Sequence, residues 1–166
     1  MPAQLRHSDV EMRNFYHISP IDHPIGAVLQ PGAFGRLYRQ FNHGGQIAPG
    51  SANVFYDLTW EAVLETARVL VAAHQPSRLN CIYACTTLAA AEAFRNAFRA
   101  GGAIFEIAVA DEVPIFQGDL ASLGSAKAGE PFLDVWVRVA TRYWTDQPPG
   151  VTEVLIGGSA TILAKV

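Results

Sequence analysis

The order of the helix- and strand-forming segments constrains the fold of this chain more strongly than any other feature. A strand is predicted at residues 14–19, then a helix at residues 59–74, a strand at residues 79–85 and a helix at residues 86–102. The remaining strands are predicted at residues 103–109, 132–144, 152–156 and 159–166. Because the strands cluster late and do not alternate regularly with helices, the order predicts an α+β fold and not a doubly wound parallel sheet.

Periodicity supports two of these predictions. In residues 59–74, apolar side chains recur at the spacing of one helix face, and Thr59 suits the N-cap. In residues 132–144, valines at alternate positions face away from Trp136 and Arg138, which is typical of a half-exposed strand. The first segment is therefore predicted to be helical and the second extended.

The bulk composition is that of one globular domain covering residues 1–166. Half of the residues are hydrophobic and 16% are charged, and this length buries a sizeable core without disulfides or metal. The polar residues 1–13 are expected to form a flexible start of the domain. A formal net charge of −3 provides no basic footprint, so duplex nucleic acid is not expected as a partner.

No segment marks the chain for a membrane or for signal-dependent secretion. The N-terminal residues lack the apolar core of a signal peptide, and no apolar run approaches the length of a membrane span. We therefore expect a cytoplasmic protein without a membrane partner, although an effector secreted by a signal-less route has the same features.

Neither the cysteines nor the histidines predict a metal or redox site. Cys81 and Cys85 are four residues apart in an apolar run, which fits buried thiols and not a CxxC pair. The histidines other than His17 have no metal-ligand spacing, so no metal is predicted.

Two segments are candidates for a ligand site. Residues 21–54 hold six glycines and three prolines, and a connector of this length in a compact domain is usually functional. In the preceding strand, "NFYHIS", His17 shares one face with Phe15 and Ser19. These three side chains suit the wall of a ligand pocket. The alternative interpretation is that His17 is a partly buried histidine whose polar atoms bind a partner within the protein.

Three segments, taken together, resemble the ADP-ribosyltransferase fold, in particular the small rifampin-modifying type. "FYHIS…IGAVLQPGAFG" is similar to the opening of that type, a strand ending in Tyr-His-Gly-Thr followed by a proline- and glycine-containing loop. "IYACTTLAAAEAFRNAF" is similar to its second segment, and "TEVLIGG" resembles the glutamate-bearing strand of the wider superfamily. The resemblance implies a split β-sheet fold with a few helices.

The chain departs from this pattern in three places. Ile18 and Ser19 follow His17 where the rifampin-modifying type has Gly-Thr, an extra helix separates the first two segments, and a further strand pair is predicted around Trp136 and Trp144. The segment "EAVLETARVLVAAHQPSRL" also looks like an uncharacterised bacterial domain family of unknown function.

The resemblance implies transfer of ADP-ribose from NAD, as a substrate, to a small-molecule or protein acceptor, or hydrolysis of NAD. Such a site holds the ribose, stacks the nicotinamide and supplies negative charge where a cation develops. Glu153 and Asp119 compete for the carboxylate role, with Glu153 slightly ahead. The resemblance assigns the other roles to Tyr83 for stacking on nicotinamide, His17 and Ser19 for the ribose, and Gly32 and Arg36 for the pyrophosphate, with Gly35 and Arg39 nearby and Ser77-Arg78 as the second choice.

Each of these residues also has a structural interpretation. Glu153 suits an edge-protecting charge, Asp119 a helix N-cap or turn, and Tyr83 half-buried packing. Glu61 falls on one flank of its helix with Glu65 and Arg68, as in solvated pairs. The alternative function is therefore a catalytically inactive binding or structural domain, which Ile18 beside His17 favours.

Overall fold

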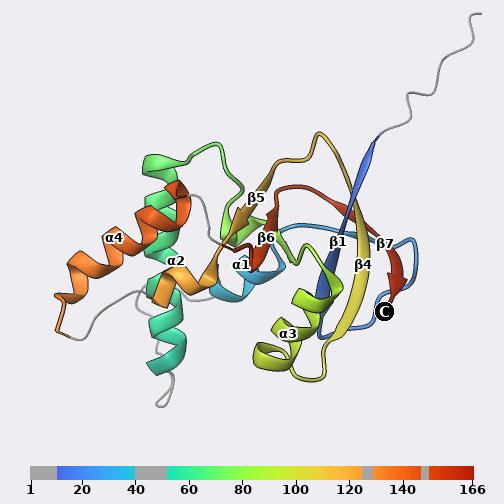
Figure 1. Cartoon of the computed structure of the whole chain (residues 1–166), viewed down its shortest axis with the longest axis horizontal. Helices are drawn as coiled ribbons and strands as arrows, with labels where there is room; N and C mark the ends of the chain where they lie inside the picture. The colour runs from blue at the N-terminus through green and yellow to red at the C-terminus, as the bar shows by residue number, and fades with distance from the viewer. Residues whose placement is uncertain (1–10, 40–51, 125–128, 147–149) are drawn as a thin grey trace, which may run out of the picture.

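The computed structural model describes residues 11–39, 52–124, 129–146 and 150–166, and within them two antiparallel sheets are accompanied by four α-helices (Figure 1). The larger sheet has the order β1-β4-β7-β2 and the smaller one the order β3-β6-β5. These strands are β1 (Met12–Ser19), β2 (Val28–Leu29), β3 (Ile82–Ala84), β4 (Ala103–Ala110), β5 (Ile115–Gly118), β6 (Glu153–Ile156) and β7 (Ala160–Lys165). The predicted α+β class is confirmed.

The two sheets meet where β1 of the larger sheet passes β3 of the smaller one. An isolated antiparallel bridge joins Tyr16 to Cys85, with both backbone hydrogen bonds formed at 2.9 and 2.8 Å. The chain also crosses from one sheet to the other between β6 and β7, at Gly157-Gly158, which separate the two strands predicted at residues 152–156 and 159–166. The junction thus places β1 of the larger sheet beside β3 of the smaller one.

The helices divide between the two sheets. They are α1 (Ala33–Arg39), α2 (Ala52–Val71), α3 (Leu88–Phe98) and α4 (Phe132–Thr145). In Figure 1, α2 and α4 lie together at the side of the smaller sheet, whereas α3 lies beside β1 and β4. Leu64 of α2 and Ala140, Tyr143 and Trp144 of α4 share one buried cluster with Leu155 of β6, so this helix pair covers the smaller sheet.

The prediction of a strand at residues 132–144 is wrong, because this segment forms α4. Its buried side chains recur at intervals of one, three and four residues, which is the spacing of a helix face. They are Val135, Trp136, Val139, Ala140, Tyr143 and Trp144. Val137 is 64% exposed, although strict alternation places it on the same face as Val135 and Val139. The Trp144 indole donates a hydrogen bond to the Leu64 carbonyl at 2.8 Å and ties α4 to α2.

The structure also corrects several predicted boundaries. Helix α2 begins at Ala52, so Thr59 lies inside the helix and is not its N-cap, and the helix ends at Val71. The connector at residues 21–54 contains β2 and α1, while residues 40–51 lie outside the described residues. No strand was predicted between residues 109 and 132, but β5 lies there, directly before Asp119.

The beginning of β1 is anchored to the larger sheet. Met12 and Arg13 pair with Ala110 and Val109 of β4, and the Arg13 guanidinium donates to the Val113 carbonyl at 2.8 Å. Residues 12 and 13 therefore do not belong to a flexible start, and residues 1–10 lie outside the described residues. Among the described helices, none combines the length and apolarity needed to cross a membrane.

Candidate functional site

A cavity of about 470 Å³ opens where the two sheets meet, a volume within the usual range for small-molecule sites. Its wall comes from the end of β1 and the turn after it, α1, β3, α3 and the start of β6. Of the residues predicted for the site, His17, Ser19, Arg36, Tyr83 and Glu153 line this cavity, whereas Asp119 and Gly32 do not.

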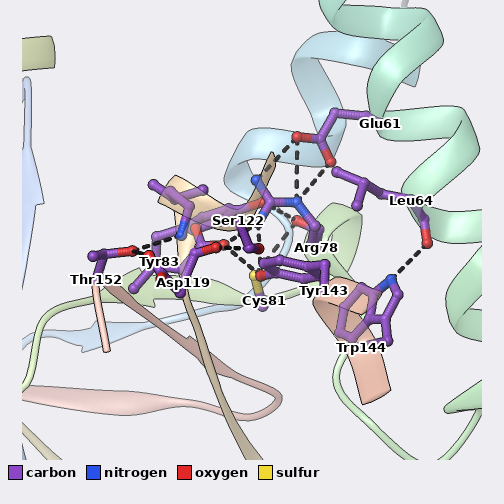
Figure 2. Close-up of polar contacts among 12 residues, drawn as sticks. Glu61, Leu64, Arg78, Cys81, Tyr83, Asp119, Ser122, Tyr143, Trp144 and Thr152 are labelled. Atoms are coloured by element: carbon purple, nitrogen blue, oxygen red, sulfur yellow. Dashed lines mark hydrogen bonds and ion pairs between the residues drawn. The ribbon is translucent and has the colours of Figure 1, made fainter. Parts of the chain in front are cut away.

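Arg78, at the start of the short 3₁₀ helix η1 (Arg78–Asn80), forms a buried ion cluster with two carboxylates at the cavity wall (Figure 2). Its Nε and Nη2 donate to Glu61 of α2 at 3.0–3.3 Å, and its Nη1 donates to Glu153. All three residues are at most 7% exposed. Two carboxylates against one guanidinium leave the cluster with one formal negative charge.

Tyr143 of α4, which does not line the cavity, completes the cluster. Its hydroxyl donates to Oε1 of Glu153 and accepts from Nη1 of Arg78 at 2.9 Å. The phenol reaches this position because it packs against Gly118 of β5, where a Cβ atom would lie 2.7 Å from its hydroxyl oxygen. Oε1 of Glu153 is thus held by two donors, whereas Oε2 accepts no hydrogen bond from any described residue.

The predicted pyrophosphate role of Ser77-Arg78 does not fit these contacts. The Arg78 guanidinium is occupied by Glu61, Glu153 and Tyr143, and the Ser77 hydroxyl donates to Glu65 at 2.9 Å. Glu61 is not on a solvated flank, whereas Glu65 pairs with Arg68 as its spacing indicates. Sequence reasoning missed the cluster because its members come from α2, η1, α4 and β6.

His17 joins the two sheets through its side chain. Its Nδ1 lies 2.8 Å from the Tyr83 carbonyl oxygen, and because a carbonyl only accepts, Nδ1 carries the proton. Burial lowers the pKa of His17, although the bond to Tyr83 opposes this. The ring is therefore neutral at pH 7, and its Nε2 offers a lone pair to a hydroxyl donor in the cavity.

Acidification is expected to destabilise the protein in part through His17. Because the pKa of His17 is lowered on folding, the unfolded chain binds its proton first, and stability falls as the pH drops below about 6.5. We expect the free energy of unfolding of the wild type to fall relative to His17→Gln by at most about 1.4 kcal/mol per pH unit. Urea denaturation at pH values from about 7.5 to about 5.5 measures this difference, and parallel curves would contradict it.

Tyr83 lines the cavity with its ring held on two sides. Its hydroxyl donates to the Arg78 carbonyl at 2.9 Å, and the Arg78 guanidinium lies 5.3 Å from the ring centroid. Phe34 of α1 meets the ring edge-to-face at 5.1 Å. Burial raises the pKa of Tyr83 well above its usual value, so the phenol stays protonated. Tyr83 is therefore packed against its neighbours, as its alternative interpretation predicts, and it also provides a fixed aromatic surface in the cavity wall.

Ser19 and Asp119 both have local structural partners. The Ser19 hydroxyl accepts from the Ile21 amide and lies 2.9 Å from Nε2 of His23, in the turn after β1. The Asp119 carboxylate accepts from the Ala121 amide at 2.9 Å, where the short 3₁₀ helix η2 (Leu120–Gly124) begins. Of the two competing carboxylates, only Glu153 lines the cavity, and Asp119 has the turn role that was its alternative interpretation.

The predicted glycines position α1 against η1. Gly32 has a φ of 92°, which favours glycine, and its amide donates to the Cys81 carbonyl at 3.1 Å. A Cβ atom at Gly35 would lie 1.9 Å from the Leu79 carbonyl oxygen. The glycines thus allow the backbone of α1 to approach the backbone of η1 closely. They do not bring the backbone close to a ligand in the cavity. Arg36, one residue later, is exposed and lines the cavity.

Phe34 and Arg99 are among the lining residues that the sequence analysis did not single out. Phe34 directly precedes Gly35, the glycine at which α1 packs against η1. It lies in a segment that was interpreted as a connector, where no helical pattern of apolar residues marks it as part of a cavity wall. Arg99 is the C-cap residue of α3, where a basic residue is common for reasons of helix stability alone.

These features define an α+β protein with two antiparallel sheets and a small-molecule-sized cavity at their junction. The sequence model of a family described as "Protein of unknown function (DUF2441)" matches residues 42–166, and the chain belongs to this family. No curated protein matches the chain. The predicted membership in a domain family of unknown function is thereby confirmed, whereas the ADP-ribosyltransferase resemblance has no counterpart in these matches.

The family match begins after α1, so part of the cavity lies before it. β1 contributes His17, and α1 contributes Phe34 and Arg36, all N-terminal to residue 42. The matched range supplies Arg78, Tyr83, Glu153 and the other lining residues after position 42. The cavity of this chain therefore combines the family domain with the 41 residues that precede the match.

Proposed function

We propose that the cavity binds NAD and that the protein cleaves its nicotinamide–ribose bond, with transfer of ADP-ribose to an acceptor or to water. The observation that carries this proposal is that His17, Tyr83 and Glu153 line one cavity although they lie far apart in the sequence. These are an acceptor for a sugar hydroxyl, an aromatic surface and a carboxylate. The resemblance to ADP-ribosyltransferases requires the same three functions.

The charge of the ion cluster supports the reaction. When the bond between C1′ of the ribose and the nicotinamide nitrogen breaks, its electron pair leaves with the nitrogen and neutralises the pyridinium. Positive charge then develops on the ribose until a nucleophile bonds to C1′ and releases its proton to solvent. Glu153 lines the cavity, and Glu61, which does not line it, adds a second negative charge to the Arg78 ion cluster, so the cluster favours the positive charge that develops on the ribose.

The fixed geometry of Glu153 adds to this electrostatic effect. Oε1 is held by Arg78 and Tyr143, so the carboxylate does not need to reorganise when the cation develops. Electrostatic stabilisation is most effective when the charged group is preorganised in a site that excludes water, and Glu153 is 4% exposed. Glu153 is therefore the proposed catalytic carboxylate, and Asp119 is not.

A second candidate function is binding of the same ligand without turnover. The observation that favours it is the ion pair itself, since the Arg78 charge beside Glu153 reduces the field that the carboxylate exerts on a ligand. Ile18 also contributes to the cavity wall next to His17, in place of the glycine of the rifampin-modifying type. In this case, NAD or a related molecule binds and is not cleaved.

A nicotinamide-release assay tests the proposal. Wild-type protein is incubated at high concentration with NAD, because hydrolysis without an acceptor can be slow, and free nicotinamide is measured. Glu153→Gln is expected to lower the rate by about 100-fold or more, since it removes the charge that faces the transition state. Asp119→Asn is the control and is expected to change the rate by less than about 3-fold.

NAD binding is measured in parallel by the rise in melting temperature that a bound ligand causes. Binding and release together, with loss of release in Glu153→Gln, support the enzyme. Binding without release supports the second candidate. No binding and no release by the folded wild type would overturn the proposal.

A further inference from the structure

The arginines of the described residues fall into two groups. Arg13, Arg68, Arg78, Arg138 and Arg142 each form an ion pair with a carboxylate. Arg36, Arg39, Arg95 and Arg99 pair with no carboxylate in the described part of the chain. All members of the second group lie on α1 or in the last turn and C-cap of α3, the two helices at the cavity. Arginines without an ion pair in the described residues thus lie on these two helices.

Two of these arginines, Arg36 of α1 and Arg99 of α3, line the cavity, whereas Arg39 and Arg95 do not. Both are exposed. Arg36 belongs to α1, and Arg99 is the C-cap residue of α3. Arg36 and Arg99 therefore project from different elements into one opening.

The charged residues of the cavity wall differ in their pairing. Glu153 and Arg78 form an ion pair in the wall, and Glu61, which does not line the cavity, gives their cluster its formal negative charge. Arg36 and Arg99 bring positive charge that pairs with no carboxylate of the described residues. An anionic group of a ligand is therefore expected beside Arg36 and Arg99, because electrostatic complementarity determines binding orientation.

We propose that Arg36 and Arg99 form a clamp for the diphosphate of a dinucleotide, an inference that rests on the proposed function and names how that site selects its substrate. Each guanidinium presents a planar fork of donors that binds phosphate oxygens in two places. Two such forks on different helices engage two linked phosphates, whereas a single phosphate occupies one fork. The site therefore selects a dinucleotide over a mononucleotide or a nucleoside.

Calorimetric titration of the full chain with a ligand series tests the clamp. The series is nicotinamide riboside, nicotinamide mononucleotide, NAD and ADP, which carry no, one, two and two phosphates. In Arg36→Gln/Arg99→Gln, the affinity for NAD and for ADP is expected to fall by about 100-fold, or about 10-fold for each arginine. The affinity for nicotinamide riboside stays unchanged, because that ligand has no phosphate.

Arg95→Gln is the matched control, since Arg95 lies on α3 without a carboxylate partner but does not line the cavity. It is expected to change the affinity for NAD by less than about 2-fold. Raising the salt concentration from about 50 mM to about 500 mM is expected to weaken NAD binding in the wild type more than in the double variant. Equal melting temperatures show that all variants are folded.

The outcomes separate the clamp from the proposed function. If NAD and nicotinamide riboside bind to the wild type and the double variant keeps full affinity for NAD, the clamp is overturned and the proposed function stands. If ADP binds in an arginine-dependent way but no nicotinamide compound binds, the clamp stands and the proposed function fails. If none of the four ligands binds, both are overturned.

Discussion

Replacing Arg78 by leucine is expected to lower the free energy of unfolding by about 3–5 kcal/mol. The substitution leaves the carboxylates of Glu61 and Glu153 buried and unpaired, at 7% and 4% exposure. It also removes the hydrogen bond between Nη1 and the Tyr143 hydroxyl. Urea denaturation followed by tryptophan fluorescence measures the loss, since Trp60, Trp136 and Trp144 lie in the clusters around α2 and α4.

Two comparisons make this prediction specific. Arg138→Leu removes an arginine whose ion pair with Glu130 is 42% and 32% exposed, and it is expected to cost less than about 1 kcal/mol. Adding Glu61→Gln and Glu153→Gln to Arg78→Leu is expected to recover part of the loss, because no unpaired charge then remains buried. Equal losses for Arg78→Leu and Arg138→Leu would show that the buried cluster does not stabilise the fold.

The Gly35→Ala variant is expected to lose about 3 kcal/mol of stability. The added Cβ atom would lie 1.9 Å from the oxygen and 2.7 Å from the carbon of the Leu79 carbonyl group. These are backbone atoms, so no side-chain rotation relieves the contact, and α1 has to move away from η1. Thermal or urea denaturation gives the loss of stability.

Because α1 carries Phe34 and Arg36, the same movement changes the cavity wall. Gly35→Ala is therefore expected to lower the affinity for any ligand of the cavity as well as the stability of the fold. Gly150→Ala is the control, since a Cβ atom there meets no heavy atom within 4 Å and the change is expected to stay within about 0.5 kcal/mol. If the Gly35→Ala variant were as stable as the Gly150→Ala variant, the close contact between Gly35 of α1 and the Leu79 backbone of η1 would be contradicted.

The elements predicted correctly are those with strong local signals. Helix α3 begins after Thr87, whose hydroxyl accepts from the Ala90 amide, as the threonine start of an alanine-rich segment indicates. β4 spans Ala103–Ala110, within one residue of its predicted end, and β6 and β7 flank the two predicted glycines. In each case, neighbouring residues supply enough information to define the element.

Residues 132–144 show where local signals conflict. Val135, Val137 and Val139 satisfy the alternation of a strand, and Val135, Val139 and Trp136 also satisfy the spacing of a helix. The conflict is resolved by α2, which offers an apolar face on which a helix buries Trp136, Tyr143 and Trp144. A strand would bury fewer of these large side chains, and their burial contributes more than the β propensity of three valines.

The candidate site was predictable in part. The local pattern around His17 pointed to a ligand cavity, and the resemblance added Tyr83, Glu153 and Arg36, all of which line it. The pairing of Arg78 with Glu61 and Glu153 was not predictable, because residue spacing describes only neighbours on one element. Arg99 was missed for the same reason, since its importance depends on how close α3 lies to α1.

Local patterns along this chain are thus sufficient to establish the α+β class, most of the strands and the strand face that carries His17, because these depend on neighbours a few positions apart. Which charges are buried, which carboxylate faces the cavity and whether residues 132–144 form a helix depend on contacts between distant segments. Desolvation and packing act through those contacts, and they appear only when the chain has folded.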